Sequence, residues 1–166
     1  MSKLISFFRN FAAMFILFKL LWLMISARRP SRISQMNAMR VGFWLRKNYA
    51  ALTFFGHILV HSQGDADRIN AHNGSLRRHE TIHLRQAQAC HNSWLCFYIL
   101  YFWYTLRALP QNKHMHNAAY YLNPFEMEAY EHMYETDYLD KCENGAQGWR
   151  VYAKMKPSER RKLSNS

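Results

Sequence analysis

The sequence predicts a mainly α fold of the α+β class: a small helical core with one short strand or hairpin, preceded by a hydrophobic N-terminal helix. Three observations support this prediction. Residues 76–109 contain neither Gly nor Pro, residues 53–62 are rich in β-branched and aromatic side chains, and residues 4–27 are strongly apolar. We expect a hydrophobic helix at 1–29, a basic linker at 30–49, the folded domain at 50–155 and a basic tail at 156–166.

The N-terminal segment is a candidate membrane anchor. From Phe11 to Ala27 the sequence is apolar apart from Lys19, and its length is at the lower limit for a helix that spans a bilayer. Lys19 would cost about 2.5–3.5 kcal/mol at the bilayer centre. No A-x-A-like cleavage site follows. The segment therefore predicts an anchor or an interfacial helix, with a helix packed on the domain as the alternative. The basic cluster that follows favours a cytoplasmic position for the domain.

After the linker, the sequence predicts a strand or hairpin, then a turn, and then the start of a long helix. TFFGHILVHS at 53–62 reads as one strand or a tight hairpin around Gly56, and SQGDAD at 62–67 is typical of a turn. Ser75 is a plausible N-cap for a helix that starts at Leu76. We therefore expect the first long helix to begin near residue 76.

Two further helices follow. The change of character near 91–93 predicts a break, and the apolar run at 94–106 is typical of a helix buried in a core, with a lipid-facing helix as the alternative. Leu109-Pro110 ends that helix. Asn123-Pro124 then predicts a helix start, with helix from Phe125 to about Asp140.

The net charge of +11 favours anionic partners. The Lys and Arg residues gather after the apolar N-terminal run and in the tail, without the interleaved aromatics of RNA-binding segments or a DNA-reading motif. Association with a membrane through residues 4–27 explains this charge better than nucleic acid does. Three cysteines without C-x-x-C spacing make a disulfide framework or cysteine zinc ligation improbable and favour a reducing compartment.

The pentapeptide HETIH at 79–83 carries the strongest functional signal. On a helix, His79 and His83 lie one turn apart on the same face, so both imidazoles can bind one metal ion. Glu80, rotated by about 100° from His79, can reach a metal-bound water without ligating the metal. A catalytic zinc site needs a third protein ligand. A metzincin site would require Gly at 86 and His at 89, where this chain has Gln86 and Ala89, so that class is excluded.

A separate downstream glutamate is the other common source of the third ligand. Residues 123–130 read NPFEMEAY, and a HExxH motif followed by E-x-x-A-[D/N/Y] on a second helix resembles the gluzincin metallopeptidases. More closely, HETIHLRQ, an aromatic-rich helix and PFEMEAY are similar to a family of small H-E-x-x-H-x-x-Q proteins. The resemblance covers about residues 53–140 and implies a minimal zincin-like core.

Carried over to this chain, the resemblance implies His79, His83 and Glu126 as zinc ligands and Glu80 as the general base. Glu128 is the competitor of Glu126, and since the two are separated by two positions on a helix, only one can face a given site. Tyr130 stands where larger families often have Asp or Asn; it could orient a ligand, contact substrate or simply pack.

Gln86 could hydrogen-bond a neighbouring ligand or loop, or be solvated. The remaining histidines lack ligand spacing: His57, His61, His72, His91, His114, His116 and His132. These observations predict a zinc-dependent peptidase that acts on peptides or proteins. The alternative is a membrane-associated, zinc-binding structural or sensing module without catalysis.

Overall fold

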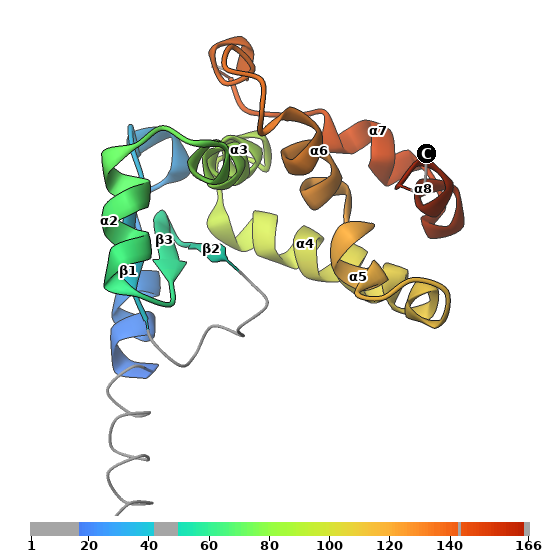
Figure 1. Cartoon of the computed structure of the whole chain (residues 1–166), viewed down its shortest axis with the longest axis horizontal. Helices are drawn as coiled ribbons and strands as arrows, with labels where there is room; N and C mark the ends of the chain where they lie inside the picture. The colour runs from blue at the N-terminus through green and yellow to red at the C-terminus, as the bar shows by residue number, and fades with distance from the viewer. Residues whose placement is uncertain (1–16, 42–49, 143, 165–166) are drawn as a thin grey trace, which may run out of the picture.

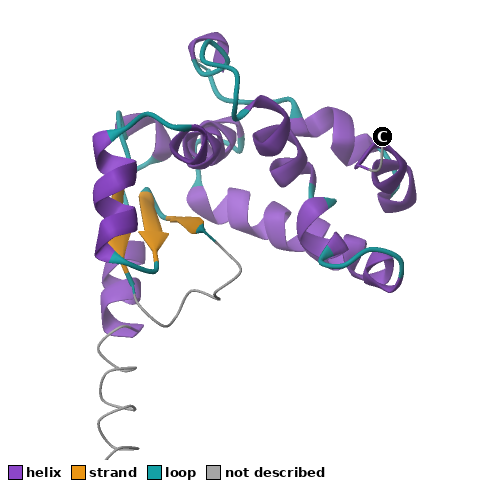
Figure 2. Cartoon of the chain, in the orientation of Figure 1, coloured by secondary structure: helices purple, strands orange, loops and turns teal. Residues whose placement is uncertain are grey.

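The computed structural model describes residues 17–41, 50–142 and 144–164. It is a mainly helical fold with one small three-stranded sheet, which confirms the predicted fold class (Figures 1 and 2). The strands are β1 (Asn37–Arg40), β2 (Ala51–Phe54) and β3 (His57–Val60), and the helices are α2 (Gln63–Ala71), α3 (Ser75–Ala89), α4 (Trp94–Ala108), α5 (Ala118–Tyr121), α6 (Pro124–His132), α7 (Trp149–Lys154) and α8 (Pro157–Ser164). Short 3₁₀ turns cover Pro30–Arg32, Leu109–Lys113 and Asp140–Cys142.

The predicted hairpin is formed by β2 and β3, which pair in antiparallel fashion. Phe55 and Gly56 connect them, and both have positive φ, as a two-residue hairpin turn with the twist of the strands requires. The Phe55 N–H donates to the hydroxyl of Tyr98 on α4 at 3.1 Å, and that hydroxyl donates to the carbonyl of Thr53. The hairpin is thus fastened to α4 at its turn.

The predicted linker at 30–49 is in part wrong, because residues 37–40 form β1. This strand pairs in parallel with β3, so the order in the sheet is β1-β3-β2. Met36 and Ala38 are buried against the core. A strand of four residues is too short to show a reliable alternation in sequence, and its pairing is made with residues twenty positions away.

The segment read as a turn at 62–67 begins a helix instead. The Ser62 hydroxyl accepts a hydrogen bond from the Asp65 N–H and thereby caps α2. The side chain of Asn70 pairs with the backbone N–H and C=O of Ala38, so α2 covers the outer edge of β1. Turn residues and cap residues are the same types, which is why the sequence alone favoured a turn.

The long helices α3 and α4 agree with the sequence, including the break between them. His91 and Asn92 have positive φ, and Ser93 caps α4 by accepting from the Cys96 N–H. The first helix begins one residue earlier than predicted, with Gly74 in the N-cap position. On α4, only Trp94, Phe97 and Ala108 are buried, so one side of this helix belongs to the core and the other does not.

The C-terminal part differs from prediction in two respects. Helix α6 starts at Pro124 with Asn123 as its N-cap, as expected, but it ends at His132 rather than near Asp140. The predicted tail contains α8, in which Arg160 is buried. In Figure 1, α7 and α8 follow α6 on the side of the molecule away from the sheet.

The predicted N-terminal helix lies only partly within the described residues, of which 17–25 are helical. Within the described part of the chain, we find no helix with the length and apolarity needed to cross a membrane. The prediction that residues 4–27 associate with a membrane stays a prediction.

Candidate metal centre

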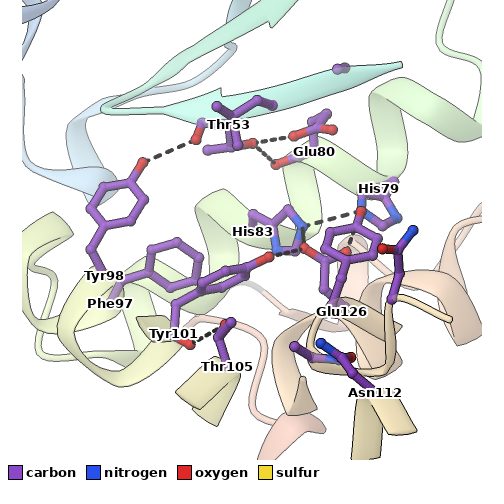
Figure 3. A pocket seen from close by; sticks show the side chains of 15 residues that line it. Thr53, His79, Glu80, His83, Phe97, Tyr98, Tyr101, Thr105, Asn112 and Glu126 are labelled. Carbon is purple, nitrogen blue, oxygen red and sulfur yellow. Dashed lines mark hydrogen bonds and ion pairs between the residues drawn. The ribbon is translucent and has the colours of Figure 1, made fainter. Parts of the chain in front are cut away.

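Two neighbouring helices bring three metal-binding side chains together. Helix α3 presents His79 and His83 from one face, and α6 presents Glu126 opposite them (Figure 3). The Nε2 atoms of the two histidines are 3.2 Å apart. Glu126 directs one carboxylate oxygen to each imidazole: Oε2 lies 3.2 Å from Nε2 of His79, and Oε1 lies 3.4 Å from Nε2 of His83.

These distances fit a metal ion bound between the three side chains. Two ligand atoms that each lie about 2.0–2.1 Å from a tetrahedral zinc ion are about 3.3 Å apart. All three residues are buried, and Glu126 Oε2 accepts no hydrogen bond in good geometry from a described residue. A buried carboxylate with few hydrogen-bond donors requires a positive charge nearby. The cluster could therefore hold a metal ion, with two nitrogen donors and a carboxylate as ligands.

In the absence of metal, the pKa values of His83 and Glu126 also indicate that a positive charge is needed beside the Glu126 carboxylate. Burial by itself lowers the pKa of His83, but the adjacent Glu126 carboxylate outweighs burial and raises this pKa to about 9. Burial likewise opposes ionisation of Glu126, and the imidazoles of His83 and His79 overcome it, so the pKa of this carboxyl lies well below its usual range. In the absence of metal, a proton on His83 balances the Glu126 charge.

The orientation of His83 is set by a chain of hydrogen bonds that leads from α3 to α6. Nδ1 of His83 lies 2.7 Å from Oε1 of Gln86, whose Nε2 donates to Oε2 of Glu128 at 2.6 Å. The hydroxyl of Tyr138 and the N–H of Gly148 donate to the other oxygen of Glu128. A Cβ at Gly148 would lie 2.7 Å from that oxygen, so glycine permits this contact. Because Gln86 Oε1 can only accept, His83 carries its proton on Nδ1 and presents Nε2 to the metal position.

Helix α4 fixes the position of Glu126. The hydroxyl of Tyr101 donates to Glu126 Oε1 at 2.6 Å. Asn123 caps α6 through its side-chain oxygen, which accepts from the Phe125 N–H, and its amide donates to the backbone carbonyl of Tyr101. The start of α6 is thereby tied to the middle of α4, one turn before the glutamate.

Glu80 lines the same cavity but is held by the sheet. The hydroxyl of Thr53 on β2 donates to Glu80 Oε2 at 2.6 Å, and both residues are buried (Figure 3). Glu80 is not a member of the His79, His83 and Glu126 group. Glu80 thus lines the cavity without belonging to the cluster, and its role as the general base stays a prediction.

Tyr130 packs against the first histidine. Its ring lies 4.6 Å from that of His79 in an edge-on arrangement, and its hydroxyl lies 3.2 Å from the hydroxyl of Tyr120. Burial, followed by the charge of Glu126, raises the pKa of Tyr120, so this phenol stays protonated at neutral pH. Among the described residues, Nδ1 of His79 has no hydrogen-bond partner, in contrast to that of His83.

A cavity of about 550 Å³ gives access to this centre. Its walls come from β2, α3, α4, α5, α6 and the loops beside them. Apart from His79, Glu80, His83 and Glu126, the described residues of the wall include no ionisable side chains except tyrosines. The aromatic part of the wall consists of Phe97, Tyr98, Tyr101 and Tyr120. Cavities of this size accommodate small ligands or a few residues of a peptide.

Of the two candidate glutamates, the structure places Glu126 in the cluster and Glu128 in the hydrogen-bond chain behind it. Gln86 contacts a histidine of the cluster, one of its two predicted roles, and is fully buried. Sequence reasoning missed Thr53, Tyr101 and Asn123. Only Asn123 carried a signal, as the N-cap of α6; the other two are ordinary strand and helix residues.

No protein-family model, curated protein or solved structure matches this chain.

Proposed function

We propose that this protein is a zinc-dependent metallohydrolase that cleaves peptide bonds, with His79, His83 and Glu126 as the zinc ligands. The observation that carries the proposal is the convergence of these three buried side chains at the separations of a tetrahedral zinc site. The resemblance to small gluzincin-like peptidases, read from HETIHLRQ and PFEMEAY, points to the same ligands. Two histidines and one carboxylate leave the fourth position open, as catalytic zinc sites require.

In the proposed reaction Glu80 is the general base. A bound zinc ion would supply Lewis acidity, lowering the pKa of a water and polarising the scissile carbonyl. Glu80 takes the proton of the attacking water and delivers it to the leaving amine. Thr53 orients the Glu80 carboxylate for this transfer through the 2.6 Å hydrogen bond from β2. Gln86 and Tyr101 keep His83 and Glu126 in place.

The cavity supports a peptide with an apolar or aromatic side chain near the cleaved bond. Its walls are rich in aromatic residues, and among the described residues that line it there is no Lys or Arg that would select an acidic substrate. β2 stands at an edge of the described sheet, and Ala51, Leu52 and Thr53 line the cavity. An extended substrate can add to such an edge by backbone pairing.

The decisive experiment combines metal analysis with a peptide-library cleavage assay on the wild type and the Glu80→Gln variant. We expect one zinc per chain in both proteins, and cleavage by the wild type only. Zinc without cleavage in either protein would favour the non-catalytic zinc-binding module. Retained cleavage by Glu80→Gln would remove Glu80 from the mechanism.

A further inference from the structure

The outer face of α4 carries a row of apolar side chains that remain exposed. Five residues form this face, and their exposed fractions range from 42 to 67%: Leu95, Ile99, Phe102, Trp103 and Leu106. At 100° per residue these positions fall within an arc of about 100° on the helix. We call this row the α4 outer face. It is a continuous stripe rather than a scatter of single residues.

The opposite side of α4 is already occupied. Phe97, Tyr98 and Tyr101 point to the core and to the cavity (Figure 3). The helix is therefore apolar on both sides, a pattern typical of helices that are covered all round. Single exposed apolar residues are ordinary on protein surfaces, but a contiguous patch with two large aromatic rings marks an interaction surface.

The charged side chains on α4 and on the 3₁₀ turn that follows it have one sign. The sequence contains no Asp or Glu between Glu80 and Glu126, and none before Asp65. At the C-terminal end of the face, Arg107 and Lys113 are exposed. The acidic residues lie instead on α2, on α3 and from α6 onward; in Figure 1, α4 runs along the lower side and α6 lies above it. An apolar stripe with exposed cations at one end complements an anionic surface.

We propose that the α4 outer face lies on the surface of a lipid bilayer that contains anionic headgroups. Phe102 and Trp103 enter the boundary between headgroups and acyl chains, where aromatic rings are favoured, and Arg107 and Lys113 contact the headgroups. A second copy of the chain would offer no acidic side chain from the same face to these cations. The proposal is independent of catalysis.

The described N-terminal helical residues have the same character. Phe18, Leu21, Trp22 and Ile25 are all exposed, and the basic residues Arg28 and Arg29 follow them. The chain thus has two separate apolar surfaces, and the predicted membrane segment at 4–27 contains the first. The α4 outer face would give the folded domain a contact of its own with the bilayer.

The test must distinguish α4 from the N-terminal segment, so it follows the fluorescence of a single residue. The full chain is mixed with vesicles of phosphatidylglycerol and phosphatidylcholine whose acyl chains carry bromine near the headgroup. The contribution of Trp103 is the difference between the wild type and the Trp103→Phe variant. We expect bromine to reduce this contribution by about twofold or more, and its emission to move to shorter wavelength.

Two controls define the contact. Trp149 lies in the core on α7, so its contribution, obtained with Trp149→Phe, should be unaffected by bromine. The Phe102→Glu variant changes an exposed side chain, and we expect it to retain metal binding while losing quenching of Trp103. Quenching of Trp103 should also decline in vesicles of phosphatidylcholine alone.

Three results would overturn the proposal. Unquenched Trp103 in a chain that sediments with the vesicles would exclude the α4 outer face from the contact. Equal quenching in phosphatidylcholine vesicles would exclude recognition of anionic headgroups. A blue shift of Trp103 that needs only a higher protein concentration would assign the face to a second copy of the chain.

Discussion

Replacing Gln86 with leucine removes the polar link between the two helices of the candidate metal centre while preserving most of the side-chain volume. Three buried groups lose a partner: Nδ1–H of His83, Oε2 of Glu128 and the backbone carbonyl of Phe125. The other oxygen of Glu128 keeps its contacts with Tyr138 and Gly148. The substitution therefore tests whether Gln86 acts on the fold alone or also on the metal ligand.

The expected losses follow from the number of groups left unpaired. The Phe125 carbonyl remains within the backbone hydrogen bonds of α6. The other two buried groups cost about 1–3 kcal/mol each without a partner, so the free energy of unfolding should fall by about 3 kcal/mol. For a chain of this size, that corresponds to a decrease in Tm of about 6–12 °C. Loss of a hydrogen bond that orients a ligating histidine typically lowers metal affinity about 10–100-fold, and we expect a change of that order for zinc.

Zinc affinity should be measured by competition with a chelator, well below the Tm of the variant, so that unfolding does not contribute. Gln88→Leu is the matched control, because Gln88 stands on the same helix and its side chain bonds to Arg85 and to the Pro30 carbonyl, away from the three residues of the cluster. This control should bind zinc like the wild type. If Gln86→Leu lowers the Tm but binds zinc with unchanged affinity, the reasoning about His83 is refuted and Gln86 is a structural residue only.

Three more predictions concern the neighbours of the centre. Thr53→Val should lower kcat by up to about 100-fold with zinc stoichiometry unchanged, because the Glu80 carboxylate loses the hydroxyl that orients it. Steady-state kinetics combined with metal analysis tests this prediction, and loss of zinc from the variant would contradict it. Tyr101→Phe should lower zinc affinity about 10-fold in equilibrium dialysis, since Glu126 loses a 2.6 Å hydrogen bond; unchanged affinity would argue against this role. In metal-free protein, burial lowers the pKa of His83, but the Glu126 carboxylate outweighs burial and raises this pKa to about 9. The ion pair between His83 and Glu126 therefore stabilises the fold fully below pH 6.5, and this stabilisation is lost as the pH rises toward 9. The difference in Tm between zinc-loaded and metal-free protein should therefore grow over this range in scanning calorimetry, and a constant difference would count against the ion pair.

The sequence predicted the elements whose signals are local. The pair His79 and His83 needs only a helix to face one metal, and the Gly- and Pro-free stretch at 76–109 indicated that helix. The left-handed residues His91 and Asn92 interrupt it where the character of the sequence changes. Asn123 and Pro124 likewise predict the start of α6, because Asn is a favoured N-cap and Pro is favoured at the first helical position.

The missed elements depend on distant partners. β1 is stabilised by pairing with β3 and by the side chain of Asn70 on α2. Neither contact can be recognised from the residues of the strand itself. α8 buries Arg160 in a segment that reads as a solvated basic tail. The early end of α6 at His132 has no clear local cause in the sequence either; the contacts of the following loop with Glu128 indicate a tertiary one.

The choice between Glu126 and Glu128 shows how hydrogen-bond donors decide which carboxylate can bind a metal. Both glutamates are fully buried, and their spacing on α6 predicts only that they face different ways. Glu128 accepts hydrogen bonds from Gln86, Tyr138 and Gly148 and is satisfied without a cation. Glu126 receives one from Tyr101 and otherwise faces two imidazoles, so its charge requires a proton on them or a metal ion between them. The carboxylate with fewer donors is the one suited to ligation, and that property belongs to the packed helices rather than to the motif.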